Sequence, residues 1–279
     1  MTPLSTTSDV HIPVGMEVRR VKIRKHPVSA LAASVRADYE AKFGEPPAEP
    51  GGWFHPDDWH RVSYVAEMLR PGGDLLDVGA GAGQFLNMLA RSGKFRSVVG
   101  IDKARFKKYT ELEPNMSKLD GDIANLQFED NSFDVVTCME VLEHIPPEVF
   151  VAGMAELRRV CRGQLIMSLP FCESEPLSKT HLRRFEADDI LELFPNASYT
   201  LLDRPRMPWM IMEERFDGTT PGRDGEPAAT VGATTGDARD ATIARLRTEL
   251  EAIQSRKVVR AANLIGRGVR RVRSRLPRW

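Results

Sequence analysis

A glycine-rich segment at residues 75–83 constrains the fold of this chain more than any other feature. It has the sequence Leu-Leu-Asp-Val-Gly-Ala-Gly-Ala-Gly, and an amphipathic stretch follows it over residues 84–91. The apolar start is typical of a buried strand, and the glycines let the backbone turn sharply and approach a ligand closely. The segment therefore predicts a strand, a glycine turn and a helix, the opening unit of a Rossmann-like sheet.

The alternation of short apolar runs and amphipathic stretches continues to about residue 216. This pattern is typical of β-α units around a mostly parallel sheet. We predict seven strands, the last two forming a hairpin, over residues 74–79, 97–102, 116–120, 133–139, 163–169, 199–202 and 207–214. We predict helices over residues 28–43, 57–70, 84–91, 106–111, 147–160 and 187–193. The fold class is α/β, with helices on both faces of the sheet.

Both ends of the chain differ from this central part. Residues 1–26 are polar and finish in a basic run, so we predict a basic N-terminal arm that is mobile or forms an edge strand. Residues 217–238 are rich in Gly, Ala, Thr, Pro and Asp and predict a flexible linker, because they bury little apolar surface. The predicted boundaries are therefore 1–26, 27–216, 217–238 and 239–279.

Residues 239–279 predict a basic amphipathic helix. Apolar side chains recur there at three- and four-residue spacing, and residues 255–279 contain nine Arg or Lys and no Asp or Glu. Such a helix favours an anionic membrane surface or a coiled-coil partner over a solvated tail. Nucleic acid is a poorer partner, since Trp279 is the only aromatic residue in this stretch that could stack on bases.

Charge and composition narrow the class of protein. Lys+Arg and Asp+Glu both number 39, so the whole-molecule charge favours neither an acidic nor a basic partner. Cys138, Cys161 and Cys172 lack the spacing of a zinc site and predict reduced thiols. No apolar run reaches about 18 residues and no signal-peptide pattern opens the chain. We therefore expect a cytoplasmic protein, with peripheral association at the inner face of the membrane left open.

Three carboxylates follow predicted strands, where ligands bind in an open parallel sheet. Asp77 precedes the glycines, where it would repel a pyrophosphate but suits a ligand that carries an amino-acid ammonium and a sulfonium. Asp102 ends the next strand, 19 residues after Gly83, and is placed to accept hydrogen bonds from both ribose hydroxyls. Asp122 follows the third strand and can accept from an adenine amino group.

Residues 73–195 resemble a class I S-adenosylmethionine-dependent methyltransferase, of the broad type that includes ubiquinone-pathway O-methyltransferases. The resemblance rests on residues 75–83, 100–102, 121–123, 133–136, 140–144 and 181–185. It implies S-adenosylmethionine as the cofactor and a seven-stranded sheet in the order 3-2-1-4-5-7-6. It also implies a cofactor-binding set that comprises Asp77, Gly79, Ala80, Gly81, Gly83, Asp102, Lys103, Asp122, Ile123 and Met139.

The residues that would face the methyl acceptor begin where the predicted strand 133–139 ends. Methyl transfer is a displacement at carbon, and a hydroxyl nucleophile also needs a group that takes its proton. His144 is the first catalytic candidate, because it follows that strand directly. His181 is the second, with a hydrogen-bonded loop histidine as the equal alternative. Arg183 and Arg184 either hold an anionic acceptor or form a solvated pair.

A divalent metal is an alternative use of the same residues. Glu140, Glu143 and His144 offer two carboxylates and one imidazole, and His181 is available as a fourth ligand. Small-RNA 2′-O-methyltransferases and some ubiquinone-pathway enzymes with a similar run use it to hold magnesium or zinc. Glu143 otherwise serves as a helix N-terminal charge or orients His144. The sequence leaves this metal open.

The predicted function is methylation of oxygen on a sugar, a glycolipid or another small hydroxylated acceptor, and a carboxyl oxygen is a further option. N- or C-methylation of a small molecule remains an alternative, with His144 only structural. An RNA 2′-O-methyltransferase is a third option, and the chain shows no RNA-binding module that supports it. A non-catalytic cofactor-binding partner protein would have a broken cofactor motif, whereas the motif at residues 75–83 is intact.

Overall fold

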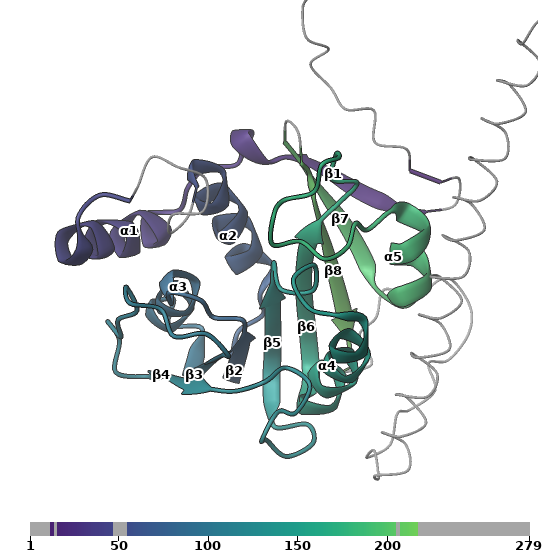
Figure 1. Cartoon of the computed structure of the whole chain (residues 1–279). Helices are drawn as coiled ribbons and strands as arrows, with labels where there is room; N and C mark the ends of the chain where they lie inside the picture. The colour runs from purple at the N-terminus through teal and green to yellow at the C-terminus, as the bar shows by residue number, and fades with distance from the viewer. Residues whose placement is uncertain (1–11, 14–15, 47–54, 205–206, 217–279) are drawn as a thin grey trace, which may run out of the picture.

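The computed structural model describes residues 12–13, 16–46, 55–204 and 207–216. Eight strands form one sheet in the order β1-β7-β8-β6-β5-β2-β3-β4 (Figure 1). The strands are β1 (Val18–Lys22), β2 (Gly72–Val78), β3 (Phe95–Asp102), β4 (Met116–Asp120), β5 (Phe133–Met139), β6 (Cys161–Pro170), β7 (Ser198–Asp203) and β8 (Trp209–Arg215). Strands β4, β3, β2, β5 and β6 are parallel neighbours, and β8 lies antiparallel between β6 and β7.

The seven predicted strands are present, and from β4 to β7 their order is the one that the resemblance implied. The predicted strand count is wrong by one, because β1 pairs in parallel with β7 at the sheet edge. The first part of the basic run at residues 19–25 thus forms an edge strand, one of the two states predicted for the N-terminal arm, and its last three residues form a 3-10 turn. Ile23, directly after β1, is fully buried and anchors this segment, while Arg19 and Arg20 are exposed. Charged side chains on an edge strand discourage pairing with another chain.

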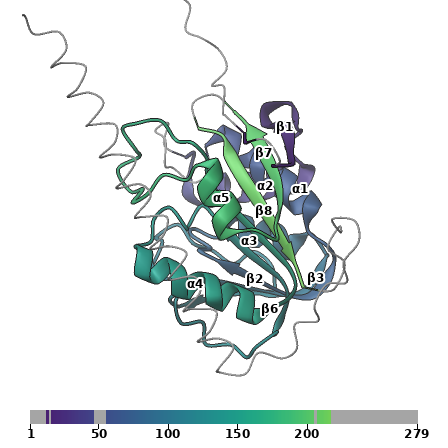
Figure 2. The ribbon, with the colours of Figure 1, turned by 90° about the vertical axis from the view of Figure 1, so that its right-hand side faces the viewer.

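The helices cover both faces of the sheet. They are α1 (Ala30–Phe43), α2 (Pro56–Met68), α3 (Gln84–Arg91), α4 (Pro147–Val160) and α5 (Ala187–Leu193), with a 3-10 turn, η1, at Ile23–Lys25. Figure 2 shows α4 and α5 together on one side of the sheet. Leu76 belongs to the core beneath α4 and α5, and Leu75 to the core beneath α1, α2 and α3. This alternation is the two-residue period of a strand buried on both faces.

The helix predicted over residues 106–111 is wrong, since this segment is a turn followed by irregular chain. Its backbone is held by other elements instead. Asn87 Nδ2 donates to the Thr110 carbonyl at 2.8 Å, and Asn87 Oδ1 accepts from the Leu112 N–H at 2.8 Å. Long-range hydrogen bonds from α3 therefore replace those that a helix would have made locally.

Within the described ranges, no helix combines the length and the apolar character that crossing a membrane requires. The predicted linker at residues 217–238 and the predicted basic helix at residues 239–279 lie outside the described residues. Their membrane and coiled-coil partners, like the four domain boundaries, stay predictions.

Candidate active site

The glycine loop between β2 and α3 lies tightly against its neighbours. Gly79, Gly81 and Gly83 all have positive φ, at 83°, 57° and 84°. The N–H groups of Gly79 and Ala80 donate to the Ile101 carbonyl at 2.8 and 3.0 Å. A Cβ on Gly79 would lie 2.2 Å from Val141 Cγ2, so the loop or the Val141 side chain would have to shift. Glycine is thus required at residue 79 both for its backbone angles and for space.

Asp102 holds this loop from the end of β3. Its Oδ2 accepts from the Gly81 N–H at 2.7 Å, and its Oδ1 accepts from the Ala104 N–H at 2.7 Å. Lys118 Nζ contacts the Gly81 carbonyl from β4 at 3.1 Å. A carboxylate has about four lone-pair sites, so Asp102 keeps acceptor capacity for a ligand hydroxyl while it fixes the loop.

A cavity of about 100 Å³ opens beside the loop. Five of the predicted cofactor residues line it, namely Asp77, Gly79, Ala80, Gly81 and Met139. The other lining residues are Arg61, Val62, Ala82, Gln84 and Phe85. The apolar and backbone surfaces suit an organic ligand, and the only charged side chains in the lining are Asp77 and Arg61. One carboxylate and one guanidinium in the same small cavity match the ammonium and carboxylate of an amino acid.

The other predicted cofactor residues are not in the lining of this cavity. Asp102 lies on β3, and Asp122 follows β4 along the same sheet edge. Lys103 is exposed and its Nζ lies 3.0 Å from Asp122 Oδ2. The Ala124 N–H and Lys103 both lower the pKa of Asp122, so its carboxylate is charged at neutral pH. Ile123 is buried, and Gly83 begins α3 with its Cβ position 2.7 Å from the Tyr109 ring.

Arg61, on α2, was missed by the sequence analysis. Its Nη1 donates to Ser168 Oγ at 3.0 Å and lies 3.5 Å from Glu140 Oε1. Only 6% of its side chain is exposed. The signal was present but weak: Arg61 is four residues before the fully buried Val65, so it occupies the inward face of the helix. An arginine on that face needs a partner within the fold or a ligand.

His144 and His181 meet at the carboxyl ends of β5 and β6. Their ring centroids are 4.8 Å apart at an interplanar angle of 73°. His144 Nδ1 contacts the Thr180 carbonyl at 3.0 Å, and His181 Nδ1 contacts Glu173 Oε2 at 2.5 Å. Because both contacts are to acceptors, each Nδ1 donates, and in the neutral ring each Nε2 then presents a lone pair. Glu173 was not singled out in the sequence, since nothing in its spacing links it to His181.

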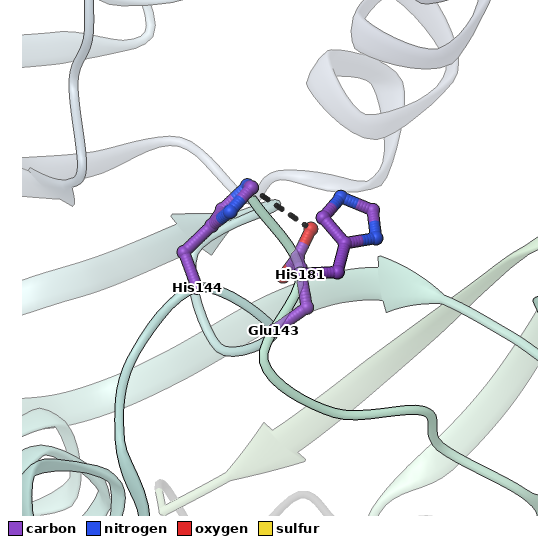
Figure 3. Close-up of side chains that lie close together, drawn as sticks. All are labelled: Glu143, His144 and His181. Atoms are coloured by element: carbon purple, nitrogen blue, oxygen red, sulfur yellow. Dashed lines mark ion pairs between the residues drawn. The ribbon is translucent and has the colours of Figure 1, made fainter. Parts of the chain in front are cut away.

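Glu143 lies beside the two imidazole rings, and its carboxylate points toward them (Figure 3). Its side chain is 1% exposed, its Oε1 is 3.8 Å from His144 Nε2, and neither oxygen has a hydrogen-bond partner. Burial and then the neighbouring Glu140 raise the pKa of Glu143 well above its usual range. A buried carboxyl without a partner is expected to hold a proton or to face a ligand that supplies positive charge.

Glu143, His144 and His181 together offer one carboxylate oxygen and two ring nitrogens within 4.8 Å of one another. Glu140, the remaining residue of the predicted metal set, is engaged elsewhere, because Ser168 Oγ donates to its Oε1 at 2.7 Å. The two unpartnered oxygens of Glu143 and the two Nε2 lone pairs fit a divalent cation such as zinc or magnesium. The same atoms fit proton transfer from a hydroxyl without a metal.

Comparison with known proteins places this geometry in a family. Residues 76–166, from β2 to β6, match the family model described as a methyltransferase domain. Over these residues the chain contains a methyltransferase domain of the kind that depends on S-adenosylmethionine. The matched residues include the glycine loop, Asp102, Asp122 and the Glu140–His144 run, as the resemblance in the sequence indicated.

Two curated relatives illustrate the likeness. The chain is 37% identical over 117 residues to the ubiquinone biosynthesis O-methyltransferase of Xanthomonas axonopodis pv. citri, which covers 39% of this chain and 48% of that protein. It is 31% identical over 133 residues to the demethylmenaquinone methyltransferase of Beutenbergia cavernae, covering 46% and 55%. The chain thus spans about half the length of these relatives. The solved magnesium protoporphyrin IX methyltransferase (ChlM) from Synechocystis PCC 6803 has a TM-score of 0.46 at 17% identity, covering 67% of this chain and 94% of that one.

Asp77, near the end of β2, is a buried carboxylate. It is 2% exposed and accepts a hydrogen bond from Thr137 Oγ1 at 2.7 Å. Burial raises the pKa of Asp77 to about 7, and the nearby Asp102 adds to the rise. The folded protein therefore holds a proton on Asp77 below pH 7, and a ligand ammonium beside this residue must displace that proton.

We expect the affinity for S-adenosylhomocysteine to fall as the pH falls through 7. The ligand ammonium binds the charged form of Asp77. Below the pKa of Asp77, each binding event must therefore release a proton. As the pH is lowered from 8 to 6, the dissociation constant should rise by about tenfold. Calorimetry over this range measures the slope. Asp77→Asn should bind more weakly at every pH and remove the dependence, and an unchanged slope in that variant would exclude Asp77 as its source.

Proposed function

We propose that this chain transfers a methyl group from S-adenosylmethionine to a hydroxyl oxygen of a small acceptor. The acceptor classes are a sugar, a glycolipid or a quinone precursor. The last follows from relatives named for ubiquinone and menaquinone synthesis. The observation that carries the proposal is the group Glu143, His144 and His181 at the end of β5. Met139, the last residue of that strand, lines the cofactor cavity, so the group lies where a methyl acceptor would enter.

The cofactor is bound by the residues that line the cavity and by the strand ends beside it. Asp77 takes the ammonium of the methionine part, Asp102 the ribose, and Asp122 the adenine. Support comes from the steric demand at Gly79, which fits close backbone contact with a ligand, and from the two acceptor sites that Asp102 retains. When bound, S-adenosylmethionine supplies a methyl group on a positively charged sulfur that leaves as a neutral thioether.

The acceptor oxygen forms the new bond to carbon and loses its proton to the protein. His144 Nε2 receives that proton, because its Nδ1 is committed to the Thr180 carbonyl and its side chain is 38% exposed toward solvent and acceptor. Glu173 holds His181 in the matching tautomer, which places a second lone pair beside the first. A general base in this position contributes about 10²- to 10⁴-fold to such reactions.

A divalent cation held by Glu143, His144 and His181 would supply Lewis acidity there and lower the pKa of an acceptor hydroxyl. Support comes from Glu143, whose two buried oxygens have no other partner. Methylation of carbon is the second candidate function, since one group of relatives is named for demethylmenaquinone. The cytoplasmic location, peripheral membrane association and RNA as an acceptor have no added support from the described residues.

The function is tested with methyl-labelled S-adenosylmethionine and fractions of quinone precursors, hydroxylated sugars, glycolipids and RNA. We expect label in one of the first three fractions. The labelled product should keep its label in acid, and its spectrum should show the signal of a new methoxy group. Chelation by EDTA before the assay, with magnesium or zinc restored in parallel, shows whether the cation is required. Label on carbon or nitrogen, or in RNA, would contradict the proposal.

A further inference from the structure

Two arginines stack on one tryptophan at the carboxyl edge of the sheet. Trp209 is the first residue of β8, is 1% exposed, and pairs with Pro170 at the end of β6. The guanidinium carbon of Arg204 lies 4.0 Å from the indole centroid, and that of Arg61 lies 4.9 Å from it. Two parts of the chain that are distant in sequence, α2 and the β7–β8 hairpin, thus bring two cations to one ring.

Three N–H groups of this cluster have no acceptor among the residues that the structure describes. They are Arg61 Nε, Arg204 Nε and Trp209 Nε1, and all three atoms are buried. A buried donor left without an acceptor costs about 1–3 kcal/mol, so one such group is tolerated and three together are unusual. A planar guanidinium and an indole N–H are both suited to the oxygens of a carboxylate or phosphate.

The acidic side chains nearby do not satisfy these donors. Asp58 lies 3.5 Å from Arg61 Nη2, and Glu140 Oε1 lies 3.5 Å from Arg61 Nη1, in both cases beyond a good hydrogen bond. Arg204 feels Asp58, Asp57 and Glu140 through space, yet burial still lowers its pKa below the ordinary arginine value. An arginine stays protonated even so, and Arg204 is therefore a partly buried cation without a direct anionic partner in the described ranges.

The arginines that the sequence indicated are used differently. Arg183 stacks on the rings of Phe150 and Phe185 and donates to the Ile145 carbonyl at 3.2 Å. The Arg183 guanidinium therefore holds the loop after β6 in place and is not directed at a methyl acceptor. Arg204, by contrast, stacks on Trp209, and its Nε has no acceptor among the described residues.

We propose that Arg204, Arg61 and Trp209 form a subsite for an anionic oxygen group, a carboxylate or a phosphate, on the acceptor. Arg61 also lines the cofactor cavity, so this subsite adjoins the methyl donor. The inference rests on the proposed function, because it assigns the anion to the molecule that is methylated. The carboxylate of the cofactor has the same chemistry, and the experiment must separate the two sources.

The test uses the full chain with ¹⁵N-labelled tryptophan, titrated with benzoate and with inorganic phosphate in the presence of saturating S-adenosylhomocysteine. We expect the indole N–H resonance of Trp209, assigned by its loss in Trp209→Phe, to shift on addition of at least one anion. Arg204→Met should weaken that binding by tenfold or more, and Arg204→Lys by less. Arg96→Met is the matched control, because Arg96 is exposed at the start of β3 and pairs with Asp74.

Each outcome decides the proposal. A resonance that neither anion shifts, or equal anion binding by Arg204→Met of unchanged melting temperature, would overturn it. Weaker S-adenosylhomocysteine binding in Arg204→Met would move the anion to the cofactor and overturn the assignment to the acceptor. Anion binding by a wild-type chain that fails to bind S-adenosylhomocysteine would refute the proposed function while the anion site itself stood.

Discussion

Gly79→Ala is expected to reduce the affinity for S-adenosylhomocysteine by at least 100-fold. The φ of 83° strains any side chain at this position, and the added Cβ would lie 2.2 Å from Val141. The loop must then move away from the cavity that it lines, and its N–H groups lose the Ile101 carbonyl. Calorimetry measures the loss, and circular dichroism checks that the fold is kept.

Gly93→Ala is the control for the backbone strain alone. Gly93 has a φ of 68°, but its Cβ position has no atom within 4 Å. It should cost about 1 kcal/mol of stability and leave the affinity unchanged. Equal binding by the Gly79→Ala and wild-type chains would mean that the glycine loop does not approach the cofactor, and the proposed cofactor site would be lost with it.

His144→Ala is expected to lower the turnover number by about 10²- to 10⁴-fold if the imidazole takes the acceptor proton. Affinity for S-adenosylhomocysteine should stay within about twofold, because His144 is not among the residues that line the cofactor cavity. Single-turnover measurements with labelled cofactor separate this chemical step from binding.

His60→Ala is the matched control. Its Nδ1 also contacts a backbone carbonyl, that of His26, at 2.6 Å, but it has no place in the Glu143 cluster. Its turnover should be unchanged at a temperature where both variants are folded. If His144→Ala turned over as fast as wild type, His144 would be structural, and methylation of a more acidic atom than a hydroxyl would become the better proposal.

The parts of the fold that depend on local pattern were predictable. The bounds of β4, β5, α3, α4 and α5 agree with the predicted residue ranges, because each is a periodic run with clear breaks at its ends. The glycine loop was predictable for a related reason, since few backbones other than a strand–turn–helix unit need glycine at three alternate positions. The strand order came from the family resemblance, and only the edge strand β1 was added to it.

Long-range partners were not predictable. Residues 106–111 have a helical pattern, but Asn87 and other groups on α1 and α3 compete successfully for their backbone. Arg61, Glu173 and Arg204 belong to the site only because α2, the loop after β6 and the β7–β8 turn converge on it. A single sequence contains no spacing rule that links them. Their roles follow from unpartnered atoms and from contacts that exist only in the folded chain.

The position of β8 has a consequence for how this protein acquires its structure. Every described strand pairing of β7 is with β1 or β8, and β8 alone joins that pair to β6. Val18 pairs with Tyr199, so β1 must find a partner that is synthesised about 180 residues later. On the ribosome, the half that carries the glycine loop can assemble first, whereas β1 has no docking place until the last strand has emerged. The nascent chain is therefore expected to form its glycine loop and Arg61 before Arg204 and Trp209 can pack beside them.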